Sequence, residues 1–225
     1  VRDFGIRSFV ERNPFQMDIE EATACDSILD FKNYKFRYKK GDRIFEADDV
    51  KIAKGKITAL IGRNGAGKTT FLNCLCGIRK CKGDLVINGK PLDWKQRRKR
   101  MFMIMQDVSH QLFTESVMEE VLLGMEEEDR DHALAILKKL DLSMVEERHP
   151  LSLSGGQMQR VAIASAIAGD QDIILLDEPT SGLDYKHMVD IAEILKELQS
   201  MGKTIIVATH DGEFIESCCN RKLII

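Results

Sequence analysis

Residues 62–69 read Gly62-Arg63-Asn64-Gly65-Ala66-Gly67-Lys68-Thr69, which has the spacing GxxxxGK[ST] of a phosphate-binding loop. An apolar run at 57–61 precedes the loop and predicts a buried strand, and residues 70–75 after it are helix-like. In such a turn, backbone N–H groups and the positive end of the helix face the same anion. Lys68 adds a point charge, and Thr69 can place its hydroxyl on Mg²⁺. The run therefore predicts a site for a nucleoside triphosphate and Mg²⁺.

A chance glycine-rich turn is the alternative, but it would not need a strand before it and a helix after it. We therefore expect the loop and the first residue beyond it to hold the nucleotide. These residues are Gly62, Asn64, Gly65, Ala66, Gly67, Lys68, Thr69 and Thr70.

The composition favours one large α/β domain or two small ones. Of the 225 residues, 44% are hydrophobic, which is enough for a sizeable core. A formal net charge of −3 argues against a dedicated nucleic-acid binder, which usually carries a strongly basic face. No apolar stretch approaches the roughly 18 residues that span a bilayer, so membrane association is expected to go through a partner.

The 6 cysteines are scattered, without the paired CxxC spacing of a zinc site or the density of a disulfide scaffold. Cys74, Cys76 and Cys81 are close in sequence, but the first two are two residues apart on a presumed helix and so face different directions. The pattern favours packed thiols over a metal cluster, and it indicates a reducing, cytosolic compartment.

The first part of the chain predicts an antiparallel β subdomain. Residues 28–38 alternate large and polar side chains in their second half, which predicts a strand, and residues 44–47 are expected to pair with it. A further strand at 84–87 ends at Asn88-Gly89, a hairpin-type turn.

The two ends of the chain predict a piece of a longer protein. Residues 1–30 have mixed charge and no sustained apolar period, which is typical of a linker segment. The chain begins at Val1 rather than Met, and residues 221–225 look like a strand that is cut before its turn.

Residues 113–168 are predicted to form a helical subdomain, with helices over residues 115–123, 129–140 and 157–168. The basic run at 95–100 is interpreted as a solvated face.

After the helical subdomain come a continuous apolar run at 173–176, a helix at 185–201 and a buried strand at 204–208. This alternation around a phosphate loop predicts an α/β fold of the P-loop NTPase class. It would have a mostly parallel, doubly wound sheet, an antiparallel β subdomain and a helical subdomain.

Two carboxylates, Asp177 and Glu178, follow the apolar run. Strand geometry predicts that their side chains point in opposite directions, so they can have different roles. Asp177 is expected to orient the Mg²⁺ shell, and Glu178 to position and deprotonate the attacking water. The alternative is that both acids only cap the next segment.

The segment Leu153-Ser154-Gly155-Gly156-Gln157 opens a helix with a hydroxyl and bare backbone amides, which makes a second anion-binding end. These motifs, followed by Ser181-Gly182-Leu183-Asp184 and His210, occur in the order found in an ATP-binding-cassette (ABC) ATPase domain. The resemblance covers residues 31–225 and leaves 1–30 as a linker segment.

In the ABC family, ATP and Mg²⁺ are sandwiched between two ATPase domains in a head-to-tail dimer. The resemblance implies that Ser154, Gly155, Gly156 and Gln157 contact the γ-phosphate held by the other subunit, and that Asp184 crosses the interface. It also implies that Gln106 approaches Mg²⁺ and the attacking water and that His210 contacts the γ-phosphate. Tyr38 stands where the family has an aromatic side chain against adenine, although Tyr34 or Phe36 could take that position.

The segment 106–113 is similar to the glutamine loop of energy-coupling-factor ATPases, which drive vitamin and metal-ion importers, although many relatives have Pro where Val108 stands. The resemblance implies the second half of a tandem protein that couples ATP hydrolysis to a transmembrane partner on the cytoplasmic side of the membrane. Contacts with that partner are expected among a few apolar side chains, each of which could instead be core: Met103, Met105, Leu112, Phe113 and Met118.

Two other functions are weighed. A soluble ABC ATPase that acts on ribosomes or DNA usually carries a long helical insertion or a basic arm, and the stretch from Gln106 to Leu153 is too short for a coiled-coil arm. A half that only holds ATP would not need both Glu178 and His210. The transported solute is not encoded here, because specificity would reside in membrane subunits.

Overall fold

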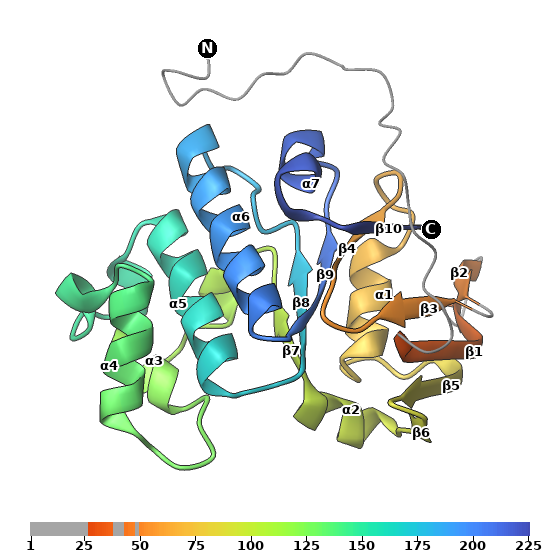
Figure 1. The fold of residues 1–225 in the computed structure, drawn as a ribbon, viewed down its shortest axis with the longest axis horizontal. Coiled ribbons are helices and arrows are strands. Elements are labelled where there is room, and N and C mark those ends of the chain that lie inside the picture. Colours follow the sequence, from red (N-terminus) through yellow and green to blue (C-terminus); the bar gives the residue numbers. More distant parts are fainter. Residues whose placement is uncertain (1–26, 38–42, 48–49) are drawn as a thin grey trace.

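The computed structural model describes residues 27–37, 43–47 and 50–225. A central parallel sheet separates a group of helices from an antiparallel sheet (Figure 1). Residues 1–26 of the predicted linker at 1–30 lie outside the described residues. Tyr38 also lies outside them.

The central sheet has five parallel strands in the order β10-β4-β9-β8-β7. Its strands are β4 (Ile57–Ile61), β7 (Met101–Ile104), β8 (Ile173–Asp177), β9 (Thr204–Ala208) and β10 (Arg221–Ile224). Except for β10, which begins with Arg221 and Lys222, these strands are near-continuous apolar runs, which fit a parallel sheet that is covered on both faces.

Both faces of the central sheet are covered, as the doubly wound prediction requires. Alternate residues of β8 enter different core clusters. Ile173 and Leu175 pack in the cluster that includes α1 (Lys68–Leu75), and Ile174 and Leu176 pack in the cluster that includes α6 (Tyr185–Ser200). The predicted α/β P-loop fold class is confirmed.

The antiparallel sheet packs over α1 on the side away from the helical group (Figure 1). Its strands are β1 (Ser27–Arg37), β2 (Arg43–Ala47), β3 (Lys51–Ala53), β5 (Lys82–Ile87) and β6 (Lys90–Pro91). β1 pairs with β2, as predicted. Asn88 and Gly89 join β5 to β6 with φ of 50° and 74°, which confirms the predicted two-residue hairpin turn.

The helical group contains α3 (Val117–Leu122), α4 (Arg130–Lys139) and α5 (Gly155–Ala168). Two short 3₁₀ turns, Ser143–Val145 and Pro150–Ser152, lie between α4 and α5. The three predicted helices are present. However, α5 starts two residues before the predicted Gln157, because Ser154 is its N-cap and Gly155 is already helical.

The sequence did not predict strands β3 and β7, helices α2 (Trp94–Arg100) and α7 (Gly212–Cys218), or the short 3₁₀ turns, which include Val108–His110. The start of α2 carries a local sequence signal for a helix N-terminus: Asp93 and Gln96 form a capping box.

The interpretation of 95–100 as a solvated face is wrong at Arg97. The neighbours Lys95, Gln96 and Lys99 are exposed, but the Arg97 side chain is buried. Its Nε donates to the Leu92 carbonyl at 3.0 Å. Charge patterning on one short segment does not report which residue turns inward, because burial depends on distant partners.

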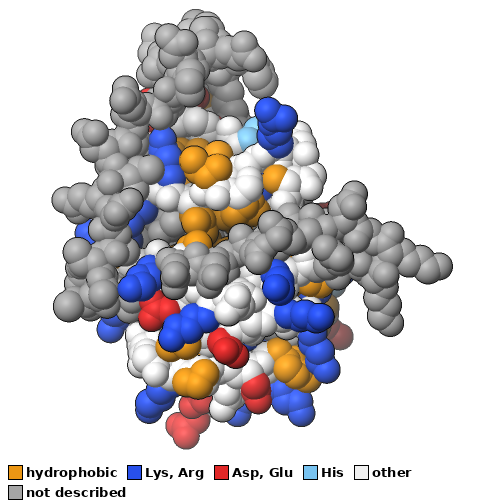
Figure 2. Space-filling view, turned by 90° about the vertical axis from the view of Figure 1, so that its right-hand side faces the viewer, with side chains coloured by type: hydrophobic (Ala, Val, Ile, Leu, Met, Phe, Trp, Pro, Cys, Tyr) orange, Lys and Arg blue, Asp and Glu red, His pale blue; other side chains and the backbone are white. Residues whose placement is uncertain are grey.

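Lys and Arg side chains are interspersed with Asp and Glu on the face that carries the antiparallel sheet (Figure 2). This face shows no single basic stripe among the described residues, in keeping with the small net charge. Within the part of the chain that the structure describes, no helix is both long enough and apolar enough to cross a membrane.

Candidate nucleotide-binding site

The phosphate loop joins β4 to α1, as the sequence predicts. Gly65 and Gly67 have φ of 81° and 102°, in the left-handed region that glycine adopts at little cost. Gly67 is the N-cap of α1, which begins at Lys68. The Lys68 Nζ donates to the Gly62 carbonyl at 3.0 Å, so its charge is folded back over the loop. This geometry suits an anion at the helix start.

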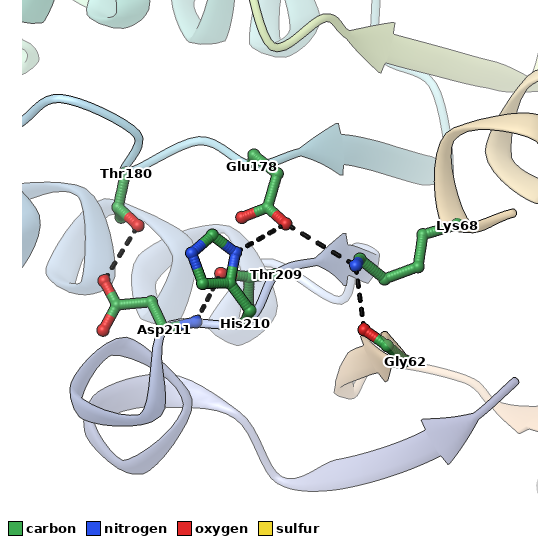
Figure 3. Close-up of polar contacts among 7 residues, drawn as sticks. All are labelled: Gly62, Lys68, Glu178, Thr180, Thr209, His210 and Asp211. Carbon is green, nitrogen blue, oxygen red and sulfur yellow. Dashed lines mark hydrogen bonds and ion pairs between the residues drawn. The ribbon is translucent and has the colours of Figure 1, made fainter. Parts of the chain in front are cut away.

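The side chains of Lys68, Glu178 and His210 meet in one cluster (Figure 3). Glu178 Oε1 lies 3.8 Å from Lys68 Nζ and 2.9 Å from His210 Nδ1. Glu178 is 13% exposed, whereas His210 is 68% exposed and can turn toward a ligand. One carboxylate therefore contacts a buried cation and an exposed imidazole.

A cavity of about 500 Å³ opens above the phosphate loop. Every residue that lines it was a predicted site residue: Asn64, Gly65, Gly67, Lys68, Thr69, Thr70, Gln106, Asp177, Glu178 and His210. The structure thus brings together residues from four separate stretches of the sequence.

The predicted opposite orientation of Asp177 and Glu178 is wrong, because both line the same cavity. Asp177 is the last residue of β8, and Glu178 has left the strand with a left-handed φ of 46°. The Glu178 N–H donates to the Ala208 carbonyl at 2.8 Å, which holds this conformation. Strand alternation does not apply beyond the strand end, and a left-handed non-glycine residue is typical of strain at a functional site.

The Asp177 carboxyl fits a magnesium ligand. It is 3% exposed, and its Oδ1 has no hydrogen-bond partner among the described residues. Burial raises its pKa, although a hydrogen bond with Thr69 opposes the shift. A buried oxygen without a partner, next to the Thr69 hydroxyl, is the oxygen-donor environment that Mg²⁺ prefers.

Two residues that the sequence analysis did not assign hold the Glu178 and His210 segments together (Figure 3). Thr180 Oγ1 donates to Asp211 Oδ2 at 3.0 Å, and the Asp211 N–H donates to Thr209 Oγ1 at 3.1 Å. Asp211 also caps α7 through Phe214 N. An N-cap signal at Asp211 was available in the sequence, but its bond to Thr180 joins residues far apart in the chain.

Tyr34 is not available to stack on adenine. It is fully buried and packs edge-on against Phe31, with ring centroids 5.3 Å apart. Phe36 is partly buried against the same core. The position expected for the stacking residue, Tyr38, lies outside the described residues.

The glutamine loop begins after β7. Gln106 is exposed and faces the cavity. Gln111 supports the loop, since its side chain accepts from Met105 N at 3.2 Å and donates to the Met103 carbonyl at 2.7 Å.

The five apolar residues proposed as partner contacts divide into two groups. Met103, Leu112 and Met118 are buried core residues, so their predicted role in partner contact is wrong. Met105 and Phe113 are 36% and 74% exposed and remain available.

The segment 154–157 forms a self-contained helix start. Ser154 Oγ accepts from Gln157 N at 3.3 Å, and Gln157 Oε1 accepts from Ser154 N at 3.1 Å. Ser154 and Gly155 are exposed. Among the described residues that line the phosphate cavity, none belongs to this segment. Ala66 and Asp184 are also absent from that lining, and Gly62 contributes only its carbonyl to Lys68.

Asp184 is the N-cap of α6 and lies near the start of α5. Its Oδ1 accepts from His187 N at 2.9 Å and lies 2.8 Å from His187 Nδ1. The backbone hydrogen bond from His187 lowers the Asp184 pKa. A Cβ at Gly156 would lie 3.3 Å from His187 Cδ2, so His187, to which we gave no role, sits between the two segments.

Comparison with known proteins identifies the family of this chain. A family model described as ABC transporter matches residues 45–181. A putative ABC transporter ATP-binding protein of Treponema denticola is 49% identical over 76% of this chain and 35% of its own length. The energy-coupling factor transporter ATP-binding protein EcfA1 of Thermotoga maritima is 36% identical over 84% of this chain and 74% of its own length.

Among solved structures, CbiO1 from Clostridium perfringens, described as part of the ABC transporter complex CbiONQ, has a TM-score of 0.79 at 31% identity. That match covers 88% of this chain and 84% of CbiO1. The chain spans only 35% to 49% of the lengths of the first three curated relatives that it matches. The resemblance drawn from the motifs is confirmed, and the chain belongs to the ABC transporter family as a P-loop ATPase domain similar to energy-coupling factor ATP-binding proteins.

Proposed function

We propose that this chain binds ATP with Mg²⁺ and hydrolyses it as one ATPase half of an importer of the energy-coupling-factor type. The observation that carries the proposal is the Glu178 carboxylate, placed between Lys68 and His210 at the edge of the cavity. An ATPase half that only bound ATP would need the charge of Lys68. It would not need the contact between the Glu178 carboxylate and the His210 imidazole.

The chain's own groups supply the proton transfer and one side of the phosphate placement. Lys68 exchanges the Gly62 carbonyl and the Glu178 carboxylate for phosphate oxygens. Glu178 is then free to accept a proton from water while the water oxygen attacks the γ-phosphorus and the bond to the bridging oxygen breaks. His210, which is exposed, turns toward the γ-phosphate. Thr69, Gln106 and Asp177 would hold Mg²⁺, which supplies charge neutralisation when bound.

A second ATPase domain is proposed to complete the site. Ser154, Gly155, Gly156 and Gln157 are exposed or half-exposed, and none of them is among the described residues that line the phosphate cavity. In a head-to-tail homo- or heterodimer, they would contact the γ-phosphate of the other domain, and Asp184 would lie at the same interface. The adenine would stack on Tyr38 or Phe36.

The membrane partner is proposed to dock beside the glutamine loop. Met105 and Phe113 expose apolar side chains on either side of that loop. The names of the relatives support a transporter, and docking would place the chain on the cytoplasmic side of the membrane. Vitamins or metal ions are the proposed solutes. Residues 1–30 are proposed to link residues 31–225 to an upstream half.

Steady-state phosphate release tests the hydrolysis proposal. We expect release that needs Mg²⁺ and falls about 10²-fold in His210→Ala, the effect of removing one electrostatic contact to the reacting group. His132→Ala, an exposed histidine on α4, is the matched control and should hydrolyse normally. Equal release in the presence of EDTA would overturn the proposal.

Fractionation of cells that express the full protein tests the transport proposal. The protein should sediment with membranes, and Phe113→Asp should release it. Exposed Met144→Asp, on the far 3₁₀ turn, is the control and should leave it bound. Sedimentation with ribosomes would favour the ribosomal alternative instead.

A further inference from the structure

A group of polar side chains lies in the core beneath α1, apart from the nucleotide cavity. Arg97 from α2, Tyr34 from β1 and Cys74 from α1 are buried, and Cys81 just before β5 is partly exposed. Among the described residues that line the phosphate cavity, none belongs to this group. The function proposed above therefore does not account for these four residues.

The guanidinium of Arg97 organises the group. Its Nη1 donates to Tyr34 Oη at 3.0 Å, to the Cys74 carbonyl at 3.4 Å and to Cys81 Sγ at 3.7 Å. The guanidinium also lies 5.5 Å from the centre of the Tyr34 ring. Cys74 and Cys81 are therefore neighbours, since the Cys74 carbonyl and the Cys81 sulfur contact the same nitrogen of Arg97.

A buried cation needs an anion nearby, because an unpaired charge in the core is costly. In the described part of the chain, Arg97 has no ion pair with a carboxylate within 4.0 Å. The Tyr34 hydroxyl and the Cys81 thiol both contact Arg97, and a thiol is ordinarily the stronger acid of the two. The geometry therefore favours a Cys81 thiolate as the counter-charge to Arg97.

The acidities of the neighbours agree with that assignment. The hydrogen bond from Cys74 lowers the pKa of Cys81, with further contributions from Tyr34 and Arg97, while burial opposes the shift. The same hydrogen bond and burial raise the pKa of Cys74, which stays a thiol and acts as the donor. Burial raises the pKa of Tyr34, so its hydroxyl stays protonated. Arg79 also faces Cys74 and carries a positive charge.

We propose that Cys81 and Cys74 form an oxidisable pair, in which Cys81 is the attacking thiolate and Cys74 the resolving thiol. Cys81 has the two properties of a reactive cysteine, since it is partly exposed and lies beside a fixed cation. Cys74 is the neighbouring cysteine, because its carbonyl and the Cys81 sulfur lie 3.4 Å and 3.7 Å from the same Arg97 nitrogen, and a neighbouring thiol is what resolves a sulfenic acid.

Hydrogen peroxide is the oxidant in this proposal. The Cys81 sulfur attacks one peroxide oxygen, the O–O bond breaks, and hydroxide leaves and becomes water with a proton from solvent. The product is Cys81 sulfenic acid. The Cys74 sulfur then loses its proton and attacks the Cys81 sulfur, the S–O bond breaks, and hydroxide leaves with that proton as water. Two thiols lose two electrons in total, and one peroxide is reduced to water.

Oxidation has a consequence for the phosphate loop, because it removes the counter-charge of Arg97. Arg97 also holds the Cys74 carbonyl near the end of α1, and the start of α1 carries Lys68. The disulfide form is therefore expected to bind Mg-ATP more weakly than the dithiol form, by about fivefold or more, the lower range of coupling between sites.

Alkylation rates test the thiolate. With limiting iodoacetamide at pH 7, mass spectrometry should show Cys81 modified about tenfold or more faster than Cys76 and Cys219, whose raised pKa values keep them protonated there. Cys218 has a lowered pKa but is buried, so it should also react more slowly than the partly exposed Cys81. Arg97→Gln should remove much of this difference, whereas Lys99→Gln, an exposed neighbour on α2, should not. If Arg97→Gln does not fold, the rates in the unmodified protein decide. Equal rates at all four cysteines would overturn the proposal.

Peroxide treatment tests the pair. One equivalent of hydrogen peroxide should yield a Cys74–Cys81 disulfide that dithiothreitol reverses, and Cys76→Ser should form it equally well. In Cys74→Ala, Cys81 should stop at a sulfenic acid that dimedone traps. A different disulfide, or none, would overturn the pairing. Equal Mg-ATP affinity of the oxidised and reduced chains would overturn the coupling to α1, whereas loss of ATP binding by both forms would count against the proposed function itself.

Discussion

The phosphate cavity and the start of α5 are both predicted to bind an anion, but they differ in how many distant residues they bring together. At the cavity, Lys68 and His210 both contact Glu178. At the start of α5, the side chains of Ser154 and Gln157 cap the helix through local hydrogen bonds, and Ser154 is exposed. We therefore propose that binding is a property of one chain, whereas hydrolysis needs the helix start of a second chain.

Replacing the catalytic carboxylate should have the largest effect and separate the two properties. Glu178→Gln is expected to lower turnover by about 10²-fold to 10⁴-fold, the range for losing a positioned general base. ATP binding should persist, because Lys68 keeps its charge. Phosphate release and isothermal titration on the same preparation measure both. Glu216→Gln, on α7 and outside the cavity lining, is the control. Near-normal hydrolysis in Glu178→Gln would refute the assigned role.

Removing the cation should abolish binding on the cavity side. Mg-ATP at about 100 times its dissociation constant should stabilise the chain by about 2.7 kcal/mol, and Lys68→Ala should lose most of this gain. Thermal or urea unfolding with and without Mg-ATP measures it. Lys54→Ala, an exposed lysine in the turn before β4, should keep the full gain. If the parent chain showed no stabilisation by Mg-ATP, the binding claim would fail.

A change at the start of α5 should alter stability less than the loss of Mg-ATP binding does. It should not change ATP binding by the single chain. Ser154→Ala removes the cap of α5 and should cost about 0.5–2 kcal/mol, while hydrolysis by the paired chains should fall sharply. Asp129→Ala is a matched control, because it removes the cap of α4 at a similar stability cost. Equal loss of hydrolysis in both variants would mean that only stability had changed.

The smallest effect concerns the pH dependence of the α6 cap. The pKa of Asp184 is lower in the folded chain, so its contribution to stability is present above the ordinary carboxyl pKa and is lost as pH falls through the folded value. Asp184→Asn keeps a capping acceptor but cannot titrate. The stability difference between parent and variant should therefore shrink in acid. A difference that stays constant down to about pH 2 would contradict this reading of the cap.

The sequence was most informative where local geometry determines the outcome. The glycines of the phosphate loop, the hairpin at Asn88-Gly89 and the cap at Ser154 each act over a few residues, and each appears as predicted. The ten residues that line the cavity were all among the predicted site residues, because the motifs specify them individually.

Predictions failed where the outcome depends on partners far away in the chain. The burial of Arg97 requires Tyr34 and Cys74, which no charge pattern near 95–100 reveals. Glu178 leaves the strand because Ala208 accepts its N–H, so strand alternation misplaced it. Met103 and Phe113 are both large apolar residues near Gln106, but only Phe113 is exposed, because Met103 lies on the edge strand β7 and packs into the core cluster that includes α1.

The most direct test is to measure hydrolysis as a function of chain concentration. It tests whether the phosphate cavity binds ATP within one chain while hydrolysis needs the start of α5 from a second chain. Phosphate release per chain should rise with chain concentration in saturating Mg-ATP, while ATP bound per chain should stay constant over the same dilution. A rate per chain that is unchanged by dilution, at concentrations where the chain is monomeric, would contradict the account.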